Sequence, residues 1–430
     1  MTAVVRGAFT AAEAGGLVRR ALVTADVERA LHSRHAVDVV AVGKAAGPML
    51  RAAVSGVVRM PLRHVVGVSA HVPQAPPAGE RWHTAAHPVP DGRSAAAARA
   101  VLDIARAADD RDLLLLLLSG GASSLLALPA DGISLEDKQR TSERLLREGG
   151  EIHALNAVRK HISAIKGGQL AAAAGGSVLA LAVSDVVGDE LSAIGSGPSV
   201  PDTTTFADAL AALDRYGGRD RYPVAVVDRL TAGERGAVRE TPKAGDSRLS
   251  RSVAHVIGGA RSAVDGARAT ATSLGYAVHV VEEPVTGEAR LAARDLVEAA
   301  SQIARTSGGR VCILAAGEMT VRVVGTGKGG RNQECALAMA RQLGALGEAA
   351  VASSVGTDGV DGPTDAAGGV VDTATIARAE AAGLGPPERY LDDNNSYVFL
   401  DKLDDLIRTG PTNTNVGDLQ VILVGGRSTP

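Results

Sequence analysis

Apolar runs of strand length recur along the first half of the chain, and each ends in glycine or small polar residues. They are "AVDVVAVGKAAG" (36–47), "DLLLLLLSGGASSLL" (112–126) and "GSVLALAVSDVVGD" (176–189), and each leads into an Ala- or Leu-rich stretch of helical type. Continuous apolar runs are typical of strands buried on both faces. The pattern predicts a parallel sheet covered by helices on both sides.

A second α/β series follows in the other half, with "YAVHVV", "RVCILAAGEMTVRVV" and "EAAVASSVGTDGVDG" as its strands. The two series are separated by a polar stretch without apolar period, about 233–252, which we expect to be a linker. The length of 430 residues also exceeds what one core usually supports. We therefore predict an α/β protein with two domains, residues 1–235 and 250–430, whose motifs face one cleft.

Composition narrows the class of protein. The net charge of −3 and the aromatic content of 2% argue against a nucleic-acid partner, which needs basic surface or stacking side chains. The run Leu113–Leu118 is too short for a bilayer span, and the N-terminus lacks a signal-peptide pattern. Cys312 and Cys335 have no metal-binding spacing and are expected to be reduced core thiols. We expect a cytoplasmic protein with no membrane partner.

Two motifs of the first half follow strands and favour anions. Lys44 in "AVGKAAG" comes directly after a strand, although Asp38 stands where a P-loop needs glycine. In "LSGGASSLL" a glycine pair and hydroxyls precede a helix, where main-chain amides can hold a phosphate or carboxylate. Ordinary helix capping explains the second motif equally well.

The stretch "NAVRKHISAIKGGQLA" places Asn156, Arg159 and Lys160 on one helix, with Lys166 further along. Residues three and four positions apart share a helix face, so Asn156 can converge with Arg159 or Lys160. A solvated basic face is the preferred interpretation unless another motif faces this helix.

Acidic residues follow strands at three further places. "SDVVGDELSAIGSGPS" supplies Asp185 and Asp189, which suit Mg²⁺ binding or proton acceptance, or else turn capping. Asp189 is the better functional candidate. "GTDGVDGPTDAAGG" carries Asp358, and Glu318 ends another strand, so both are candidates for a metal or a nucleotide.

The turn "GTGKGGRNQE" (325–334) lies between a β-branched strand and an Ala-rich helix. Gly325, Gly327 and Gly330 have the spacing of a dinucleotide-binding turn, but Lys328 and Arg331 add cations that such a turn does not need. This combination predicts a phosphate ligand.

Taken together, these strings resemble the bacterial and archaeal glycerate 2-kinase family, whose C-terminal part is called the MOFRL domain. The resemblance runs from about Gly43 to Val424 and rests on "HPVPDGRS", "LLSGGASSLL", "NAVRKHISAIKGG", "GDELSAIGSGPSVPD", "GGRNQECALA", "GTDGVDGPTDAAGG" and "TGPTNTNVGDL". It implies a Rossmann-like N-terminal domain, a smaller α/β MOFRL domain and an active site in the cleft between them. It also implies ATP-dependent, Mg²⁺-dependent phosphorylation of the 2-hydroxyl of D-glycerate.

The resemblance and the motifs together assign roles to residues. Family positions carried over residue by residue make Lys44, Asp189 and Arg331 catalytic. The expected metal ligands are Asp189, Glu318 and Asp358. The expected substrate- and phosphate-binding residues are Ser119, Gly120, Gly121, Ser123, Asn156, Arg159 and Lys160. The expected nucleotide-binding residues are Gly327, Lys328, Gly329, Gly330, Asn332, Gln333 and Asp358.

Three alternatives stay open at this point. The chain could be an NAD(P)H-dependent hydroxypyruvate reductase, a kinase acting on a related small hydroxy acid, or a non-catalytic nucleotide-binding protein. Against the reductase, a ribose-binding acid is expected about 20 residues after the glycine turn, and Asp358 comes somewhat late. The expected partners are D-glycerate or a similar acid and ATP, and a homodimer is an open option.

Overall fold

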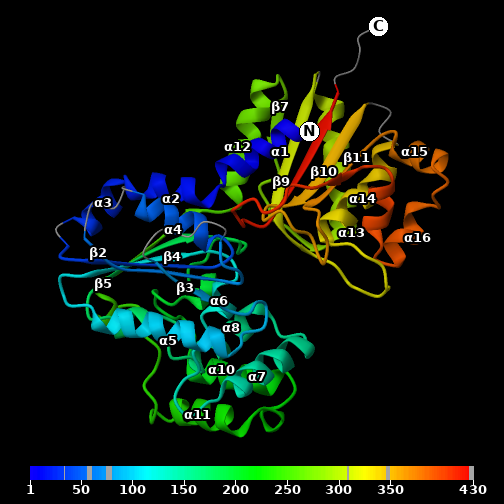
Figure 1. Cartoon of the computed structure of the whole chain (residues 1–430). Coiled ribbons are helices and arrows are strands. Elements are labelled where there is room, and N and C mark those ends of the chain that lie inside the picture. The colour runs from blue at the N-terminus through cyan, green and yellow to red at the C-terminus, as the bar shows by residue number, and fades with distance from the viewer. Residues whose placement is uncertain (33, 56–60, 74–79, 308, 345–348, 426–430) are drawn as a thin grey trace. The chain divides into compact units, whose positions relative to one another are not determined.

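The chain folds into two compact units, each with its own β-sheet (Figure 1). The computed structural model describes residues 1–32, 34–55, 61–73, 80–307, 309–344 and 349–425. The parallel-sheet unit comprises residues 14–184 and 189–257, and the mixed-sheet unit comprises 1–13, 185–188 and 258–430. The predicted α/β class with a Rossmann-like sheet is confirmed.

The sheet of the parallel-sheet unit has the strand order β3-β2-β1-β4-β5-β6. The pairs β3–β2, β2–β1, β1–β4 and β4–β5 are all parallel. The strands are β1 (Val37–Val42), β2 (Leu62–Ser69), β3 (Arg81–Thr84), β4 (Leu113–Leu118), β5 (Ser177–Val183) and β6 (Ser252–Gly258). This is the doubly wound order, in which the chain reverses its winding direction between β1 and β4.

Every residue of β1, β4 and β5 is buried, as their unbroken apolar sequences predict. In Figure 1, helices α2 to α4 cover one face of this sheet and α5 covers the other. The helices of this part are α2 (Ala14–Leu22), α3 (Ala25–Leu31), α4 (Ala46–Val54), α5 (Gly92–Ala107), α6 (Ala122–Leu125) and α9 (Gln169–Ala173).

A separate group of helices in the same unit fixes the position of α8 (Ile152–His161). It packs through an apolar cluster that includes Leu145, Leu155, Val158 and Leu213. The other helices are α7 (Leu135–Arg147), α10 (Phe206–Arg215) and α11 (Val224–Glu234), and short 3₁₀ turns are η1 (Ile194–Ser196), η2 (Arg219–Arg221) and η3 (Ser247–Leu249). α8 is therefore held by a core of its own.

The mixed-sheet unit has the strand order β12-β11-β10-β13-β9-β7, and β8 also pairs with β9. The strands are β7 (Ala277–Val280), β8 (Val285–Glu288), β9 (Val311–Thr320), β10 (Ala350–Gly356), β11 (Gly368–Asp372), β12 (Leu406–Ile407) and β13 (Asp418–Val424). The pairs β9–β13, β13–β10, β10–β11 and β11–β12 are antiparallel. β7 and β8 run parallel to β9.

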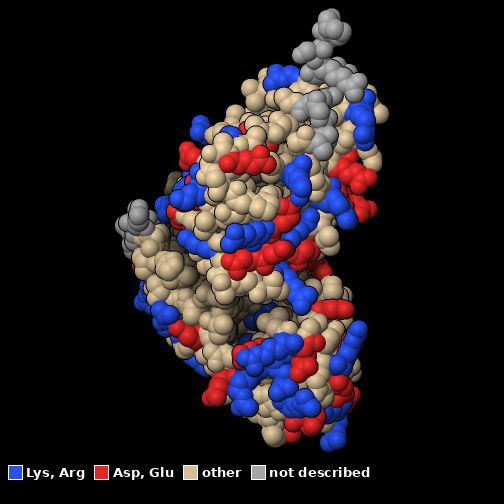
Figure 2. Space-filling view, turned by 90° about the vertical axis from the view of Figure 1, so that its right-hand side faces the viewer, with Lys and Arg blue, Asp and Glu red and all other residues tan. Residues whose placement is uncertain are grey.

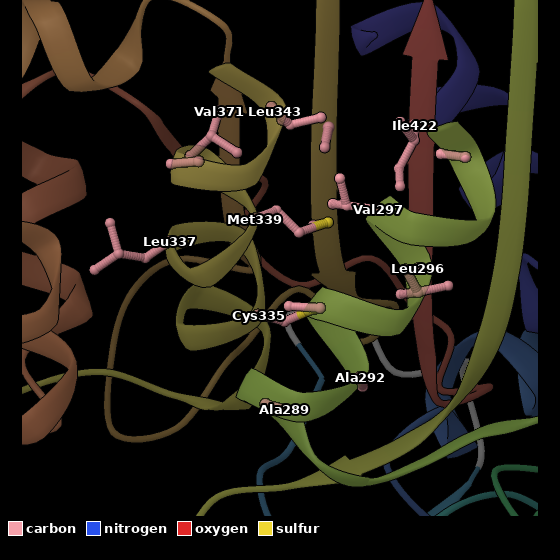
Figure 3. Packing of buried hydrophobic residues seen from close by; sticks show 14 of the residues in the cluster. Ala289, Ala292, Leu296, Val297, Cys335, Leu337, Met339, Leu343, Val371 and Ile422 are labelled. Carbon is pink, nitrogen blue, oxygen red and sulfur yellow. The ribbon is translucent and has the colours of Figure 1, made fainter. Parts of the chain in front are cut away.

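Helices cover both faces of the mixed sheet, with α1 and α12 on one face and α13 and α14 on the other (Figure 1). The helices are α1 (Thr2–Ala11), α12 (Ala260–Ser273), α13 (Ala289–Thr306), α14 (Arg331–Gly344), α15 (Thr375–Ala381), α16 (Pro387–Asp392) and α17 (Ser396–Lys402). Figure 3 shows Cys335 and Met339 of α14 in one apolar cluster with Leu296 and Val297 of α13. Burial raises the pKa of Cys335 and of Cys312 to about 12, consistent with reduced core thiols.

The division of the chain differs from the expected one in three places, and one of them is the short segment 185–188, which belongs to the mixed-sheet unit. Helix α1 belongs to the mixed-sheet unit, where Gly7 and Gly266 let it approach α12 so closely that a Cβ on Gly266 would lie 2.4 Å from the Cβ of Ala11. The expected linker, 233–252, is attached to the parallel-sheet unit instead. Its Thr241 Oγ1 donates to Asp202 at 3.0 Å. Contacts between residues distant in sequence decide to which unit α1 and the segment 233–252 belong, and the local sequence pattern does not predict these contacts.

The distribution of charged side chains on the surface agrees with the small net charge of −3. On the face drawn in Figure 2, Lys and Arg side chains lie among Asp and Glu side chains, without a field of one sign. Along the described residues, no helix combines the length and apolar character needed to cross a bilayer.

Candidate active site

Two loops of the parallel-sheet unit meet at the carboxyl ends of β1 and β4. The main-chain amide of Lys44 donates to the carbonyl of Gly120 at 2.9 Å, and the amide of Ala45 donates to Ser119 Oγ at 3.1 Å. These residues are far apart in sequence and adjacent because β1 and β4 pair in register. This is the point where open α/β sheets bind their ligands.

Glycines make this close approach feasible. Gly43 has φ +127°, and a Cβ there would lie 2.1 Å from Ser119 Oγ. Gly121 has φ +85°, and a Cβ there would lie 3.0 Å from Cδ2 of His87. Since other residues rarely adopt such φ values, both positions favour glycine.

The two loops use their polar groups differently. The hydroxyl of Ser119 is buried and already bonds to Ala45 and to the carbonyl of Val42, so it holds the Lys44 loop in place. The amides of Gly120 and Gly121 have no acceptor among the residues that the structure describes. They therefore remain available to an anion.

His87 is a member of this group that sequence reasoning did not assign a role. Burial lowers the pKa of His87, and the nearby Lys44 cation lowers it further. The imidazole is therefore neutral near pH 7 and can accept or donate a hydrogen bond there. The only sequence feature that could have indicated a role for His87 was its position in "HPVPDGRS", one of the strings that carry the family resemblance.

A second polar group lies between α6, α8 and η1. The ammonium of Lys166 donates to the carbonyl and hydroxyl oxygens of Ser123 at 2.9 and 2.8 Å and to the carbonyl of Gly195 at 3.2 Å. Ser123 Oγ is 2.9 Å from Ser196 Oγ, which donates to Asn156 Oδ1 at 3.3 Å. The structure thus brings the predicted Ser123 and Asn156 together and adds Lys166 and Ser196.

The interpretation of "NAVRKHISAIKGG" as a solvated basic face is wrong, because most of these side chains are buried. Asn156, Lys160 and Lys166 are 8%, 3% and 2% exposed, and α8 ends at His161. Lys160 lies apart from the Ser123 group, since its ammonium pairs with the buried Asp202 at 3.1 Å. That partner gives Lys160 an internal role, and its contact with substrate stays a prediction.

Asp189 and Asp185 have different surroundings. Asp185 accepts a hydrogen bond of 2.7 Å from Asn415 Nδ2, within the mixed-sheet unit. Asp189 is exposed, and no partner for its carboxylate is found among the described residues. Its φ of +55° is unusual for a residue with a side chain, although Asp tolerates this region better than most. The backbone thus presents an exposed carboxylate on a constrained turn.

Arg331 begins α14 in the mixed-sheet unit and lies between two carboxylates. Its Nε donates to Asp418 Oδ2 at 2.8 Å, and its Nη2 is 3.4 Å from Glu318 Oε1. Burial by itself lowers the pKa of Arg331, but Asp418, Glu318 and Asp361 outweigh it and raise the pKa. The guanidinium is held as a permanent, one-third-exposed cation.

The glycine turn before α14 packs against another part of its own unit. Asn394 Oδ1 accepts from the amides of Val324 and Gly325, Asp393 accepts from Thr326 and Gly327, and Asn395 Oδ1 accepts from Lys328. A Cβ on Gly327 would lie 2.4 Å from the Cβ of Asn395. Close packing against 393–396 therefore explains these glycines. Their amides are not available to a phosphate.

The start of α14 is capped from a distant loop. Asp361 accepts from the amides of Asn332 and Gln333 at 3.1 and 2.8 Å, and a Cβ on Gly330 would lie 2.4 Å from its carboxyl carbon. Burial raises the pKa of Asp361 to about 6. Asn332 and Gln333 thus have internal partners, and Gly330 packs against Asp361. The nucleotide-binding role of Gly329, Gly330, Asn332 and Gln333 stays a prediction. Lys328, by contrast, is exposed, with its ammonium 3.9 Å from the Tyr397 ring centre.

The expected metal ligands do not form a preassembled cage. Among the described residues, a group of three or more potential ligands within 4.8 Å of one another is found at His35, Asp109 and Asp112, and it includes none of Glu318, Asp358 and Asp189. Mg²⁺ is usually held by one or two carboxylates together with substrate phosphates and water. The exposed Glu318 and the half-buried Asp358, which also caps its own turn through Val360, fit that mode of binding.

Comparison with known proteins places this geometry in a family. Residues 1–231 match the family model described as a domain of unknown function, DUF4147, and residues 311–418 match the MOFRL family model. D-glycerate 2-kinase of Thermotoga maritima is 38% identical over 392 residues, covering 90% of each chain. The chain belongs to the glycerate 2-kinase family.

Other members agree in sequence and in fold. Glycerate 2-kinase of Pyrococcus horikoshii is 40% identical over 344 residues, 79% of this chain and 77% of its own. The crystal structure of the Thermotoga maritima glycerate kinase matches with a TM-score of 0.84 at 36% identity, covering 98% and 97% of the two chains. A solved Pyrococcus horikoshii OT3 structure matches with a TM-score of 0.79 at 35% identity, covering 99% and 97%.

Proposed function

We propose that this chain phosphorylates the 2-hydroxyl of D-glycerate with ATP, giving 2-phosphoglycerate and ADP. The observation that carries the proposal is the loop pair at the β1–β4 switch point, where Lys44 lies beside two glycine amides that have no acceptor among the described residues. Similarity to a D-glycerate 2-kinase over 90% of the chain supports the choice of acceptor.

Phosphoryl transfer requires mainly positioning and positive charge around the moving group. In this proposal Lys44 and the amides of Gly120 and Gly121 bind phosphate oxygens, because they lie together at one sheet edge. Arg331 supplies a second cation, held by Asp418. Lys328, exposed beside Tyr397, and Asp358 are the remaining candidates for nucleotide contacts.

Asp189 is proposed to accept the proton of the attacking hydroxyl. An exposed carboxylate on a constrained turn has the chemistry of a general base, because it can take the hydroxyl proton as the oxygen attacks the γ-phosphorus. When bound, Mg²⁺ neutralises charge on the phosphates. Glu318 and Asp358 are the carboxylates proposed to hold it, and Asp189 is the alternative ligand if another group takes the proton.

The decisive experiment identifies the product. Purified full-length protein is incubated with ATP, Mg²⁺ and D-glycerate, and the ¹H-coupled ³¹P NMR spectrum is recorded. A phosphate on carbon 2 couples to one proton and gives a doublet, whereas a phosphate on carbon 3 couples to two and gives a triplet. A doublet that appears only with D-glycerate and Mg²⁺ is expected.

The same preparation tests the alternatives. NADH or NADPH consumption with hydroxypyruvate, without ADP formation, would establish the reductase instead. Faster ADP formation with another small hydroxy acid would reassign the acceptor. ATP binding without turnover on any of the acids would favour a non-catalytic nucleotide-binding protein.

A further inference from the structure

Three cations of the parallel-sheet unit, Lys138, Arg159 and Lys166, lie close enough to shift one another's pKa, and no carboxylate of the described residues pairs with them. Lys138 Nζ donates to the carbonyls of Arg159 and Ile162 at 3.2 and 3.5 Å, and Lys166 Nζ donates to the oxygens of Ser123 and Gly195. All these acceptors are neutral. Among the described residues, the guanidinium of Arg159 has neither a hydrogen-bond nor an ion-pair partner. The positive charge of this cluster is therefore uncompensated.

The neighbouring cation shows that the fold compensates charge where no ligand is needed. Lys160, next to Arg159 in sequence, is 3% exposed, comparable to Lys138 and Lys166 at 4% and 2%, and Asp202 pairs with it at 3.1 Å. Asp202 is also tied to Thr241 and Thr204. A buried cation is normally paired in this way, so three unpaired ones together require an explanation.

The pKa shifts of Lys138 and Lys166 also indicate that this cluster lacks a compensating negative charge. Burial, and then the charge of Arg159, lowers the pKa of Lys138 to about 7. Burial, and then Lys138 and Arg159, lowers the pKa of Lys166 well below its ordinary value. Arg159 cannot lose its proton in the same way, because a guanidinium stays charged in proteins. Arg159 thus remains the obligatory cation at this site.

Polar groups beside the cluster suit a small hydroxy acid. Asn156 is on the same face of α8 as Arg159, three positions earlier, and its Oδ1 accepts from Ser196. Ser196 Oγ lies against Ser123 Oγ, which Lys166 holds. A planar guanidinium matches a carboxylate through two parallel N–H···O bonds, and the hydroxyls and amide can bind alcohol groups.

We propose that Arg159 binds the carboxylate of the acceptor, with Lys138 and Lys166 holding the surrounding protein oxygens and Ser123 and Asn156 beside its hydroxyl groups. The assignment rests on the proposed kinase function for the identity of the acid. It requires an anion of carboxylate type and excludes neutral polyols as good acceptors. Lys138 and Lys166 are positioning residues, because their ammonium groups bond to protein oxygens.

The test compares a charged and a neutral acceptor of the same shape. D-Glyceramide differs from D-glycerate by an amide in place of the carboxylate. Wild-type protein should show a kcat/KM about 10- to 100-fold higher for D-glycerate, the range of a hydrogen-bonded charged group. In Arg159→Gln the ratio should collapse toward one, mainly through the KM for D-glycerate. Arg147→Gln, a solvent-exposed arginine of α7 paired with Glu143, is the matched control.

Calorimetric titration with D-glycerate in the absence of nucleotide gives a readout that does not depend on turnover. Arg159→Gln should raise the Kd about 10- to 100-fold, and Arg159→Lys, which keeps the charge without the fork, should fall in between. Unchanged Kd and unchanged discrimination in a folded Arg159→Gln protein overturn the assignment. D-Glycerate binding that depends on Arg159, together with no phosphorylated product, would retain the carboxylate site and reject the kinase proposal. If Arg159→Gln does not fold, the ratio of kcat/KM for D-glycerate to that for D-glyceramide in Arg159→Lys is the test. A ratio below that of wild type supports the assignment, and an unchanged ratio overturns it.

Discussion

Asp418 accepts the Nε–H of Arg331 at 2.8 Å while its second oxygen accepts from Asn332 at 2.8 Å. The carboxylate is fully buried at the start of β13, and the guanidinium is one-third exposed at the start of α14. Asp418 also accepts the amide of Met319 on β9. One side chain thus fixes the arginine to two strands, so the direction of the guanidinium depends on Asp418.

The first prediction is that Asp418→Asn reduces kcat about 10- to 100-fold, because it replaces a charged hydrogen bond to Arg331 by a neutral one. Stability should also fall, since the new amide group faces N–H donors. Glu282→Gln is the control, because its carboxylate pairs with an arginine, Arg261, at 3.4 Å on the surface. Steady-state kinetics below the Tm of each variant measure the effect. A kcat per folded molecule equal to wild type would leave Asp418 with a structural role alone.

Lys44 and Arg331 are predicted to stabilise charge on the transferred group. Lys44→Ala and Arg331→Ala should each lower kcat on the order of 10³-fold, as for other cations at phosphoryl groups. Arg331→Ala should in addition lower the Tm, because it leaves the buried Asp418 without its cation. Arg331→Lys retains a charge for Asp418 and separates the two effects. A variant with normal kcat and a raised KM would assign that residue to ground-state binding.

The glycine turn before α14 should matter for folding more than for nucleotide affinity. In Gly327→Ala the new Cβ would lie 2.4 Å from Asn395 and 2.5 Å from the carbonyl of Asp393. We expect a loss of about 1–3 kcal/mol of unfolding free energy, typical of overpacking. Gly92→Ala, where a Cβ meets nothing within 4 Å, is the control. Unchanged stability together with weaker ATP binding would restore the phosphate-binding interpretation.

These residues show where sequence reasoning succeeds and where it stops. The ends of strands can be predicted from the sequence, because buried apolar runs such as Leu113–Leu118 are followed closely by glycine. Neighbouring parallel strands then bring these ends to one edge of the sheet. The spacing of Gly325, Gly327 and Gly330 is equally visible but ambiguous, since close packing and phosphate binding both favour glycine. The partners that decide between them, Asp393 and Asn395, lie more than sixty residues away.

The same limit applies to charged side chains. Lys160 and Arg159 are neighbours in a basic run, yet one is paired with Asp202 and the other has no carboxylate partner among the described residues. Periodicity places both on α8 but does not identify what packs against each face. Asp418 was visible at the end of "TNTNVGD", but its role depends on the pairing of β13 with β9. Tertiary contacts supply this information.

The unfolding free energy should increase with pH on the alkaline side because of Lys138. Its pKa is about 7 in the folded protein against 10.5 ordinarily. Between these values the folded side chain is neutral and the unfolded one is charged. The unfolded state therefore binds more protons, and stability rises with pH by up to about 1.4 kcal/mol per unit.

Lys138→Met should remove this contribution, so that the slope between pH 7 and 10 becomes smaller than in wild type. Urea unfolding at pH 7, 8, 9 and 10 measures the slopes. Lys402→Met, at an exposed position of α17, should leave the slope unchanged. Equal slopes in wild type and Lys138→Met would show that Lys138 keeps its proton in the folded state.

The last prediction concerns Asp189, for which the substitution Asp189→Asn distinguishes a catalytic role from a role in forming the turn. Asn fits the φ of +55° as well as Asp does, and the carboxylate is exposed, so Asp189→Asn should keep the wild-type Tm. As the proton acceptor, Asp189 should account for a loss of about 10²- to 10⁴-fold in kcat. Raising Mg²⁺ should not restore activity, whereas a pure metal ligand would be partly rescued. Kinetics across a Mg²⁺ series distinguish the two roles. Normal turnover by the folded variant would instead show that Asp189 only forms the turn, and the proton would have to leave through another group.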